Sequence, residues 1–256
     1  MVRERQDDSD ANVLEQGNIY FMYRPRVQQD GADDPSDVQR FYMALKPKGK
    51  SNYRLMVIGR KRLPDVREHE RVWGFVDMVT DNPKEIEQEL QEHAYETKTR
   101  GKRTVPAARP AGEGTYAIAQ TDKQMHLVYA LELPKRPGEV QKDLKIAPEA
   151  SFALSVKNPE KGQPKDAGLR SKEKPDLPEE KQEEFRNRRF DSEQPELLDY
   201  EGIEFVLVGA RSNPEEQYGL DLEPEQENPR TANIIKDLRM TKSHHPVEPL
   251  LKGEWR

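Results

Sequence analysis

The sequence predicts an α+β fold: a single domain built on a large, mainly antiparallel β-sheet with a few short helices. Most of residues 18–157 consists of runs rich in aromatic and β-branched residues, a composition typical of strands. Clusters of turn-forming residues separate the runs, which favours hairpin connections between neighbours. A further strand-like run lies beyond a polar stretch, and its apolar face needs the same sheet as a partner.

Eight segments are predicted to be strands. In chain order they are NIYFMYRPRV (18–27), RFYMALK (40–46), YRLMVIGR (53–60), RVWGFVDMVT (71–80), GTYAIAQT (114–121), QMHLVYALEL (124–133), SFALSV (151–156) and IEFVLVGA (203–210). The turns KPKGKSN (46–52) and TDKQ (121–124) connect two pairs of them as hairpins.

The central strands are apolar on both faces. In residues 53–60, Leu55 and Val57 point to one side while Met56 and Ile58 point to the other. Strands of this kind are covered on both sides. The sheet therefore either closes into a barrel with a filled interior or carries helices on its outer face.

Helical patterns are few. NPKEIEQELQEHA (82–94) places Ile86 and Leu90 four residues apart on one helix face. RPGEVQKDL (136–144) predicts one short helix, and a polar helix over 178–188 is plausible because Pro178 suits a first helical position.

Composition divides the chain into five parts. We expect a polar flexible N-terminus (1–16), a main β-rich domain (17–158), a linker or mobile loop (159–176), a helix and strand returning to the main sheet (177–210), and an acidic, loop-rich C-terminal extension (211–256). Lys and Arg outnumber Asp and Glu by one in residues 1–158, whereas residues 159–256 have a net charge of −7. The linker has almost no large apolar residues and cannot offset the entropy of ordering.

The overall composition limits the classes of function. Cysteine is absent, which excludes disulfides, thiolate metal sites and a cysteine nucleophile. No run approaches the roughly 20 apolar residues that span a bilayer, and the N-terminus does not resemble a signal peptide. We therefore expect a soluble cytoplasmic protein with no membrane partner and no cofactor. The oligomeric state is left open.

One basic loop stands out in a chain with a net charge of −6. Five cations occur between residues 97 and 112 without a single acid, and three consecutive cations lie at the end of a predicted strand in GRKRLP (59–64). At a shared rim of the sheet, the two groups would attract phosphate or an acidic partner surface. A solvated loop paired with the protein's own acidic tail is the alternative. The candidate binding residues are Arg60, Lys61, Arg62, Lys98, Arg100, Lys102, Arg103 and Arg109.

Other motifs are weaker. AGEGTY has the glycines of a phosphate turn, but it opens a strand, so the helix N-terminus that would hold the phosphate is missing. The plainer interpretation is that Gly112 and Gly114 supply unusual backbone angles. The pair His244 and His245 lacks a spaced carboxylate or third histidine, so we expect no metal. A low pI of 5.6 and missing recognition motifs disfavour nucleic acid.

Three ionisable residues lie in strands that should be largely buried. They are Asp77, His126 and Glu132, the last two on one face of the same strand. Buried carboxylates are either paired or have a raised pKa, and both conditions are common at active sites. A structural ion pair of Asp77 or Glu132 with Arg54 or Arg60 is the alternative to catalysis.

Several blocks of the sequence resemble a family of uncharacterised bacterial proteins, with similar sequences in some plants and fungi. The blocks are GNIYFMYRPRV, RLMVIGRKRLP, PAARPAGEGTYAIA, HLVYALELPKRPGEVQ, SFALSVKNPE and PELLDYEGIEFVLVGA. The resemblance covers about residues 17–210. It implies a self-contained fold and brings no activity, substrate or catalytic residue with it.

Two functions remain. The first is a non-enzymatic binding or interaction module that uses the basic loop to contact an anionic ligand or an acidic partner. The second is a hydrolase-type enzyme for a phosphorylated or otherwise anionic substrate, with Asp77, His126 and Glu132 as acid and base groups. An enzyme needs these three side chains within hydrogen-bonding reach around one pocket, whereas a binding module needs only the surface.

Overall fold

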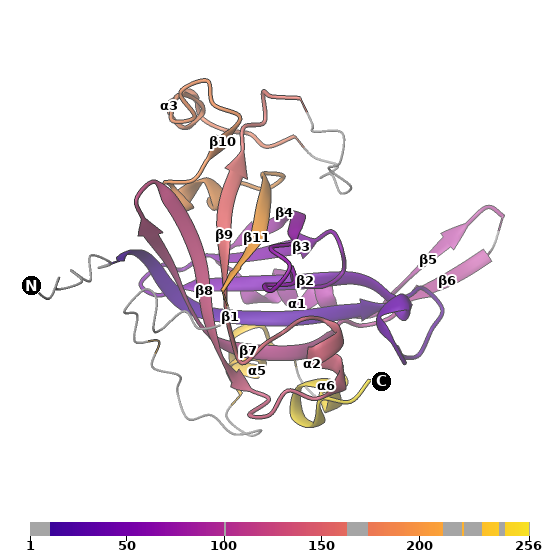
Figure 1. Cartoon of the computed structure of the whole chain (residues 1–256). Coiled ribbons are helices and arrows are strands. Elements are labelled where there is room, and N and C mark those ends of the chain that lie inside the picture. The colour runs from indigo at the N-terminus through magenta and orange to yellow at the C-terminus, as the bar shows by residue number, and fades with distance from the viewer. Residues whose placement is uncertain are drawn as a thin grey trace, which may run out of the picture.

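The backbone forms a closed barrel of eight antiparallel strands (Figure 1). The computed structural model describes residues 11–99, 101–162, 174–211, 222, 232–240 and 244–255. The barrel strands are β1 (Asn12–Pro25), β2 (Val38–Pro47), β3 (Tyr53–Ile58), β4 (Arg71–Thr80), β7 (Arg109–Thr121), β8 (Gln124–Leu133), β9 (Glu149–Lys157) and β11 (Glu204–Arg211). Their order around the barrel is β9-β11-β4-β3-β2-β1-β7-β8, and β8 pairs with β9 to complete the circle.

The late strand β11 closes the barrel. Its Phe205 pairs with Gly74 of β4 on one side and with Val156 of β9 on the other. Phe205 and Leu207 are fully buried in the interior cluster. The expectation that this segment returns to the main sheet is confirmed, and of the two predicted arrangements the structure has the barrel.

Side chains of alternate strand positions fill the barrel interior. From β1 these are Ile19, Phe21 and Tyr23, whose intervening neighbours Tyr20 and Met22 face outward. Phe21 packs edge to face on Tyr129 of β8, with ring centroids 5.0 Å apart. The interior is therefore a packed aromatic and aliphatic core.

Short helices pack on the outer face of the barrel, one beside β4 and two beside β7. They are α1 (Pro83–Leu90), α5 (Asn233–Asp237) and α6 (Glu248–Lys252). Each places an apolar side chain on the outward side chains of the strands: Ile86 from α1, Ile234 from α5 and Leu250 from α6. Both predicted coverings of the apolar strands, a filled interior and packed helices, are thus present together.

Different elements cover the two ends of the barrel. At the end where β1 finishes and β7 starts, α2 (Glu139–Asp143) adds Val140 to the interior cluster. We call this the hairpin end, because the two-stranded sheet of β5 (His93–Thr97) and β6 (Gly101–Val105) projects from it (Figure 1). At the opposite end the 3-10 helix η2 (Pro195–Asp199) adds Leu197 and Leu198. We call this the ion-pair end.

Small elements complete the described chain. They are the 3-10 helix η1 (Pro35–Asp37), helix α3 (Glu179–Glu183) and β10 (Phe190–Asp191), which pairs with the end of β9. Part of the expected linker lies outside the described residues, as do residues 1–10 and much of the expected C-terminal extension. The described parts of that extension are docked: the Glu113 carboxylate accepts hydrogen bonds from the backbone N–H groups of Asn233 and Ile234, at 3.2 and 2.8 Å.

The structure corrects two local predictions. β1 starts at Asn12, six residues earlier than expected, because Glu15 is buried and paired inside the barrel. Gly112 and Gly114 lie inside β7 and are not among the described glycines with a positive φ. Their role is close packing, since a Cβ on Gly114 would lie 2.0 Å from the carbonyl oxygen of Ala130.

Removing β11 should unfold the barrel. Truncation after residue 158 leaves β4 and β9 with unpaired edges and opens the interior cluster. We expect a fragment of residues 1–158 to be insoluble or to lack a cooperative thermal transition. Co-expression of residues 159–256 as a separate chain should restore a soluble complex. A monomeric fragment with native-like melting would contradict the role given to β11.

Candidate functional site

The predicted basic loop is the β-hairpin of β5 and β6. Its base is anchored to the loop after β1: the Thr104 N–H donates to Gln28 Oε1 at 2.6 Å, and the Gln28 N–H donates to Thr104 O at 2.9 Å. The buried guanidinium of Arg24 holds the segments on both sides of the hairpin through the carbonyl oxygens of Pro106 and Gln91, at 2.8 and 3.2 Å. We call this hairpin the arm and its base the root. The root is therefore fixed to the barrel.

Beyond this root the hairpin is exposed. Lys98 and Lys102 are exposed, Arg103 is half-buried, and Arg100 lies outside the described residues. Tyr95 pairs with Arg103 across the hairpin and is 43% exposed. Glu96, opposite Lys102, is the only acid in β5 and β6. The described part of the arm thus presents an aromatic ring and two exposed cations, Lys98 and Lys102, to solvent.

Arg109 has a different position from the other cations of the predicted loop. It begins β7, is only 4% exposed, and donates a hydrogen bond to the carbonyl oxygen of Asp30. The residue is among those that line a polar cavity of about 530 Å³ at the root of the hairpin. The structure therefore splits the predicted basic loop into an exposed arm and a buried cation.

The cavity brings together residues from three distant parts of the chain. Gln28, Gln29 and Asp30 come from the loop after β1, Glu92 and Thr104 from the hairpin region, and His244 and His245 from the C-terminal part. His245 is fully buried, and its Nδ1 lies 2.8 Å from the carbonyl oxygen of Ala108. Because a carbonyl only accepts, Nδ1 carries the proton and Nε2 of the neutral ring is an acceptor.

Two acceptor atoms in this wall have no partner among the described residues. They are His245 Nε2 and Gln29 Oε1, both buried. Burial lowers the pKa of His245, and the neighbouring charges of His244 and Arg24 act in the same direction, against the Ala108 carbonyl and Glu87. The ring is therefore neutral at pH 7, which keeps Nε2 an acceptor.

The second predicted group of cations lies at the same end of the barrel. Arg109, Tyr23, Phe41 and Ile58 are successive partners in one row across the strands, and the turn of Arg60, Lys61 and Arg62 follows Ile58. Their charges are engaged locally. Arg60 and Arg62 both pair with Glu70, and Lys61 donates to the Val38 carbonyl at 2.6 Å.

The three candidate catalytic residues are far apart. His126 and Glu132 are six residues apart on β8, about 20 Å along an extended strand. Asp77 is on β4, and β11 and β9 lie between β4 and β8. Asp77 is half-buried and lies 3.9 Å from Arg40, which replaces the expected pairing with Arg54 or Arg60. Burial lowers the pKa of His126. The fold therefore separates the three groups along β8 and across the barrel wall.

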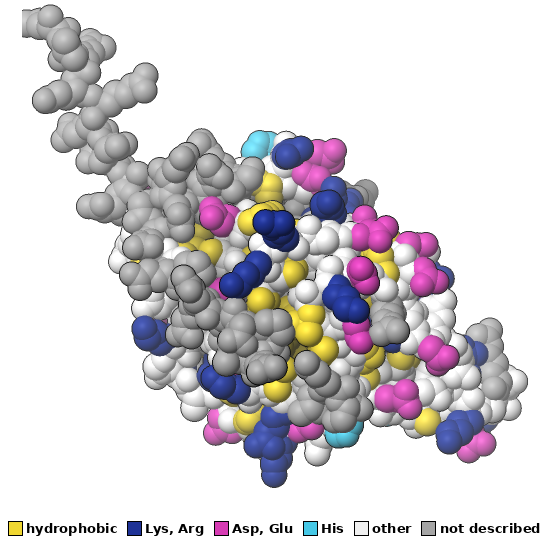
Figure 2. Space-filling model, turned by 90° about the horizontal axis from the view of Figure 1, so that it is seen from below, with side chains coloured by type: hydrophobic (Ala, Val, Ile, Leu, Met, Phe, Trp, Pro, Cys, Tyr) yellow, Lys and Arg dark blue, Asp and Glu magenta, His cyan; other side chains and the backbone are white. Residues whose placement is uncertain are grey.

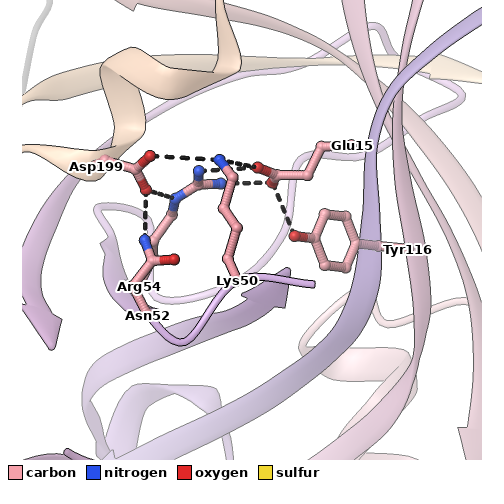
Figure 3. Close-up of polar contacts among 6 residues, drawn as sticks. All are labelled: Glu15, Lys50, Asn52, Arg54, Tyr116 and Asp199. Carbon is pink, nitrogen blue, oxygen red and sulfur yellow. Dashed lines mark hydrogen bonds and ion pairs between the residues drawn. The ribbon is translucent and has the colours of Figure 1, made fainter. Parts of the chain in front are cut away.

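Arg54 instead forms the centre of a buried network at the ion-pair end (Figure 3). Its guanidinium donates to both Glu15 carboxylate oxygens, at 2.5 and 2.9 Å, and to Asp199 Oδ1 at 2.6 Å. Tyr116 donates to Glu15 at 2.8 Å, and Lys50 lies 3.2 Å from Glu15 and 3.5 Å from Asp199.

The pKa shifts in this network keep Arg54 and Asp199 charged and Tyr116 protonated. Burial alone would lower the pKa of Arg54, but hydrogen bonds and charges from Asp199 and Glu15 raise it overall. Burial would raise the pKa of Asp199, but its bond to Arg54 holds the value below normal. Burial and the Glu15 charge raise the pKa of Tyr116 well above its usual range. Every group is satisfied by another, so the network is a structural link between β1, β3, β7 and η2.

The remaining surface offers fewer candidates. Figure 2 shows Lys and Arg interspersed with Asp and Glu around a band of hydrophobic side chains on the face seen from below. Within the described ranges, no three His, Asp or Glu side chains gather closely enough to hold a metal ion. No helix in that part of the chain is both long and apolar enough to cross a membrane.

Sequence reasoning missed three contributors to the cavity. Gln29 and Thr104 are ordinary polar residues in the sequence, and His245 was considered only as a metal ligand. His245 reaches the cavity through a contact with Ala108, 137 residues away, which no local pattern could indicate. Comparisons of this chain with models of known families, with curated proteins and with solved structures gave no match. The geometry alone therefore carries the functional argument.

Replacing Arg54 should strongly destabilise the fold. Arg54→Met leaves the Glu15 and Asp199 carboxylates without their buried cation, which costs about 3–5 kcal/mol of unfolding free energy. The matched control Arg60→Met removes an exposed cation of one ion pair and should change stability by about 1 kcal/mol or less. Urea unfolding followed by tryptophan fluorescence measures both. Equal effects of the two variants would show that the network is not structural.

Proposed function

We propose that the protein is a non-enzymatic interaction module whose β5–β6 hairpin contacts an acidic surface of a partner protein. The observation that carries this proposal is the exposed arm itself, which projects from the barrel (Figure 1) and holds Tyr95 beside Arg103. Tyrosine and arginine are enriched among residues that dominate binding energy at protein interfaces. Their neighbours Lys98 and Lys102 add charge complementary to an acidic partner.

The net charge of the whole chain favours contact through the arm and not through the rest of the surface. The protein has a net charge of −6, so an acidic partner is repelled by the molecule as a whole. Charge screening over about 8 Å at physiological ionic strength lets a local basic arm act separately from that net charge. The arm is held at its root, and the described residues next to its tip, Lys98 and Thr99, are exposed, which suits a contact element.

Catalysis receives less support. The hydrolase alternative needs Asp77, His126 and Glu132 around one substrate, and the fold separates them along and across the strands. The proposal therefore treats these residues as parts of the barrel wall.

Reversing the charge of the arm should weaken binding to an acidic probe without lowering stability. We expect Lys102→Glu with Arg103→Glu to weaken binding of a fluorescent ten-residue polyglutamate peptide about 10-fold or more at low salt. Raising the salt concentration should weaken binding of the parent protein in the same way. Lys98→Glu with Lys102→Glu, at two exposed positions, should reproduce the effect.

The matched control is Lys48→Glu with Lys123→Glu, which makes the same charge change at exposed turns of the ion-pair end. Fluorescence anisotropy measures binding, and thermal melting checks the fold. If the control weakens binding as much as the arm variants, the general field of the protein is responsible. If the arm variants bind normally but melt several degrees lower, the cations are structural, and the proposal fails.

A further inference from the structure

The arm has an open strand edge along β5. Within the described residues, β5 and β6 form a sheet of only two strands, so each has a single neighbouring strand. The outer edge of β6 is partly used at the root, where Gln28 bonds to both backbone groups of Thr104. Because the arm projects from the barrel (Figure 1), another chain can reach the outer edge of β5. Open strand edges of this kind readily pair with a further strand.

The bonds to Gln28 show which backbone groups of β5 face the open edge. The N–H and C=O groups of Thr104 point away from β5, toward Gln28. In an antiparallel pair the residue opposite such a position also turns its backbone groups outward, and the direction alternates along the strand. Thr104 pairs with Ala94, so Ala94 and Glu96 present their N–H and C=O groups at the open edge.

The charges of β5 fit a second copy of the same strand. Two identical edges related by a two-fold axis pair antiparallel. The register centred on Tyr95 pairs all of β5 with its copy and places Ala94 opposite Glu96. Just beyond the ends of the paired strands, it sets Glu92 opposite Lys98, and both are exposed. Opposite charges that face each other in this way stabilise a strand pair.

The neighbouring registers are unfavourable. A centre at Ala94 sets Glu92 opposite Glu96, and a centre at Glu96 sets the two copies of Glu96 opposite each other. Like charges directly opposite destabilise a strand pair. The charge pattern therefore selects the register centred on Tyr95.

The same register brings two tyrosines together at the two-fold axis. The backbone groups of Tyr95 face Arg103 of β6, so the two Tyr95 residues form a non-hydrogen-bonded pair, the type with the closer side chains. Tyr95 is one of two large hydrophobic residues that are exposed in the described part of the chain. A cross-strand aromatic pair would shield this ring from water and add to the stability of the contact.

We propose that two copies of this chain form a symmetric dimer in which the β5 edges pair antiparallel about Tyr95 and join the arms into a four-stranded sheet. The inference goes beyond the proposed function, because it assigns the β5 edge to a second copy. Lys102 and Arg103 belong to β6, the outer strand of the joined sheet, and stay open to an acidic partner. A contact between two five-residue strands is small, so we expect a reversible dimer with a dissociation constant of about 1–100 μM.

Sedimentation velocity on the full-length protein, without any peptide, measures the dimer independently of the acidic partner. We expect the parent protein to shift from monomer to dimer over this concentration range. A protein that stays monomeric up to about 300 μM overturns the proposal.

Charge reversal at the ends of the strand pair tests the register. Lys98→Glu and Glu92→Lys each place like charges opposite each other twice in the dimer, and each should weaken dimerisation about 10-fold or more. An equimolar mixture of the two variants restores both attractive pairs and should dimerise within about threefold of the parent. Lys48→Glu, at an exposed turn of the ion-pair end, is the matched control and should dimerise like the parent. A mixture as weak as either variant alone overturns the proposal.

Ala94→Pro tests the backbone pairing separately from the charges. It removes an N–H that faces the open edge, while the backbone groups of His93 and Tyr95 that face β6 stay in place. Dimerisation should weaken about 10-fold or more. Thermal melting and the amide shifts of Arg103 and Val105 show whether the barrel and the arm keep their fold. A folded Ala94→Pro variant that dimerises like the parent overturns the proposal, and if the variant disturbs the arm, the mixture of charge variants decides.

Discussion

The structure depends on the insertion of β11 between β4 and β9. These two strands are separated by a long stretch of sequence and have no other link in the described barrel wall. With β11 in place, each of the eight barrel strands has two neighbours and the barrel wall has no open edge. The closed wall then encloses the interior cluster. Because successive strands run in opposite directions, the loops between them lie alternately at the two ends of the barrel.

The two ends have different chemistry. At the ion-pair end, the Arg54 guanidinium donates hydrogen bonds to the carboxylates of Glu15 and Asp199. These buried charges neutralise one another and hold β1, β3 and η2 together. At the hairpin end, cations remain exposed on the arm, and a polar cavity retains buried acceptors at His245 and Gln29. A fully satisfied network stabilises one conformation, whereas exposed cations are available to a charged partner. This contrast is why function is proposed at the hairpin end.

Much of the fold could be predicted from the sequence, because alternation of apolar residues is a local signal. The strand at 203–210 was predicted to return because Phe205 and Leu207 needed an apolar partner, and it pairs with two strands. The hairpin of β5 and β6 was not predicted as strands, since it is exposed on both faces and has no alternation to detect. The start of β1 was missed because burial of Glu15 depends on Arg54, 39 residues away. The basic loop was identified, but its division into an arm and a buried Arg109 depends on the loop after β1.

Chemical-shift mapping of amide groups tests most directly whether recognition lies at the hairpin end. The polyglutamate peptide would be added to ¹⁵N-labelled protein. The account predicts that the peptide perturbs the arm, while the ion-pair end stays unchanged. The reporting residues are Tyr95, Lys98 and Lys102 for the arm, and Glu15, Arg54 and Asp199 for the ion-pair end. Largest perturbations around Arg54, with none at the arm, would contradict the account.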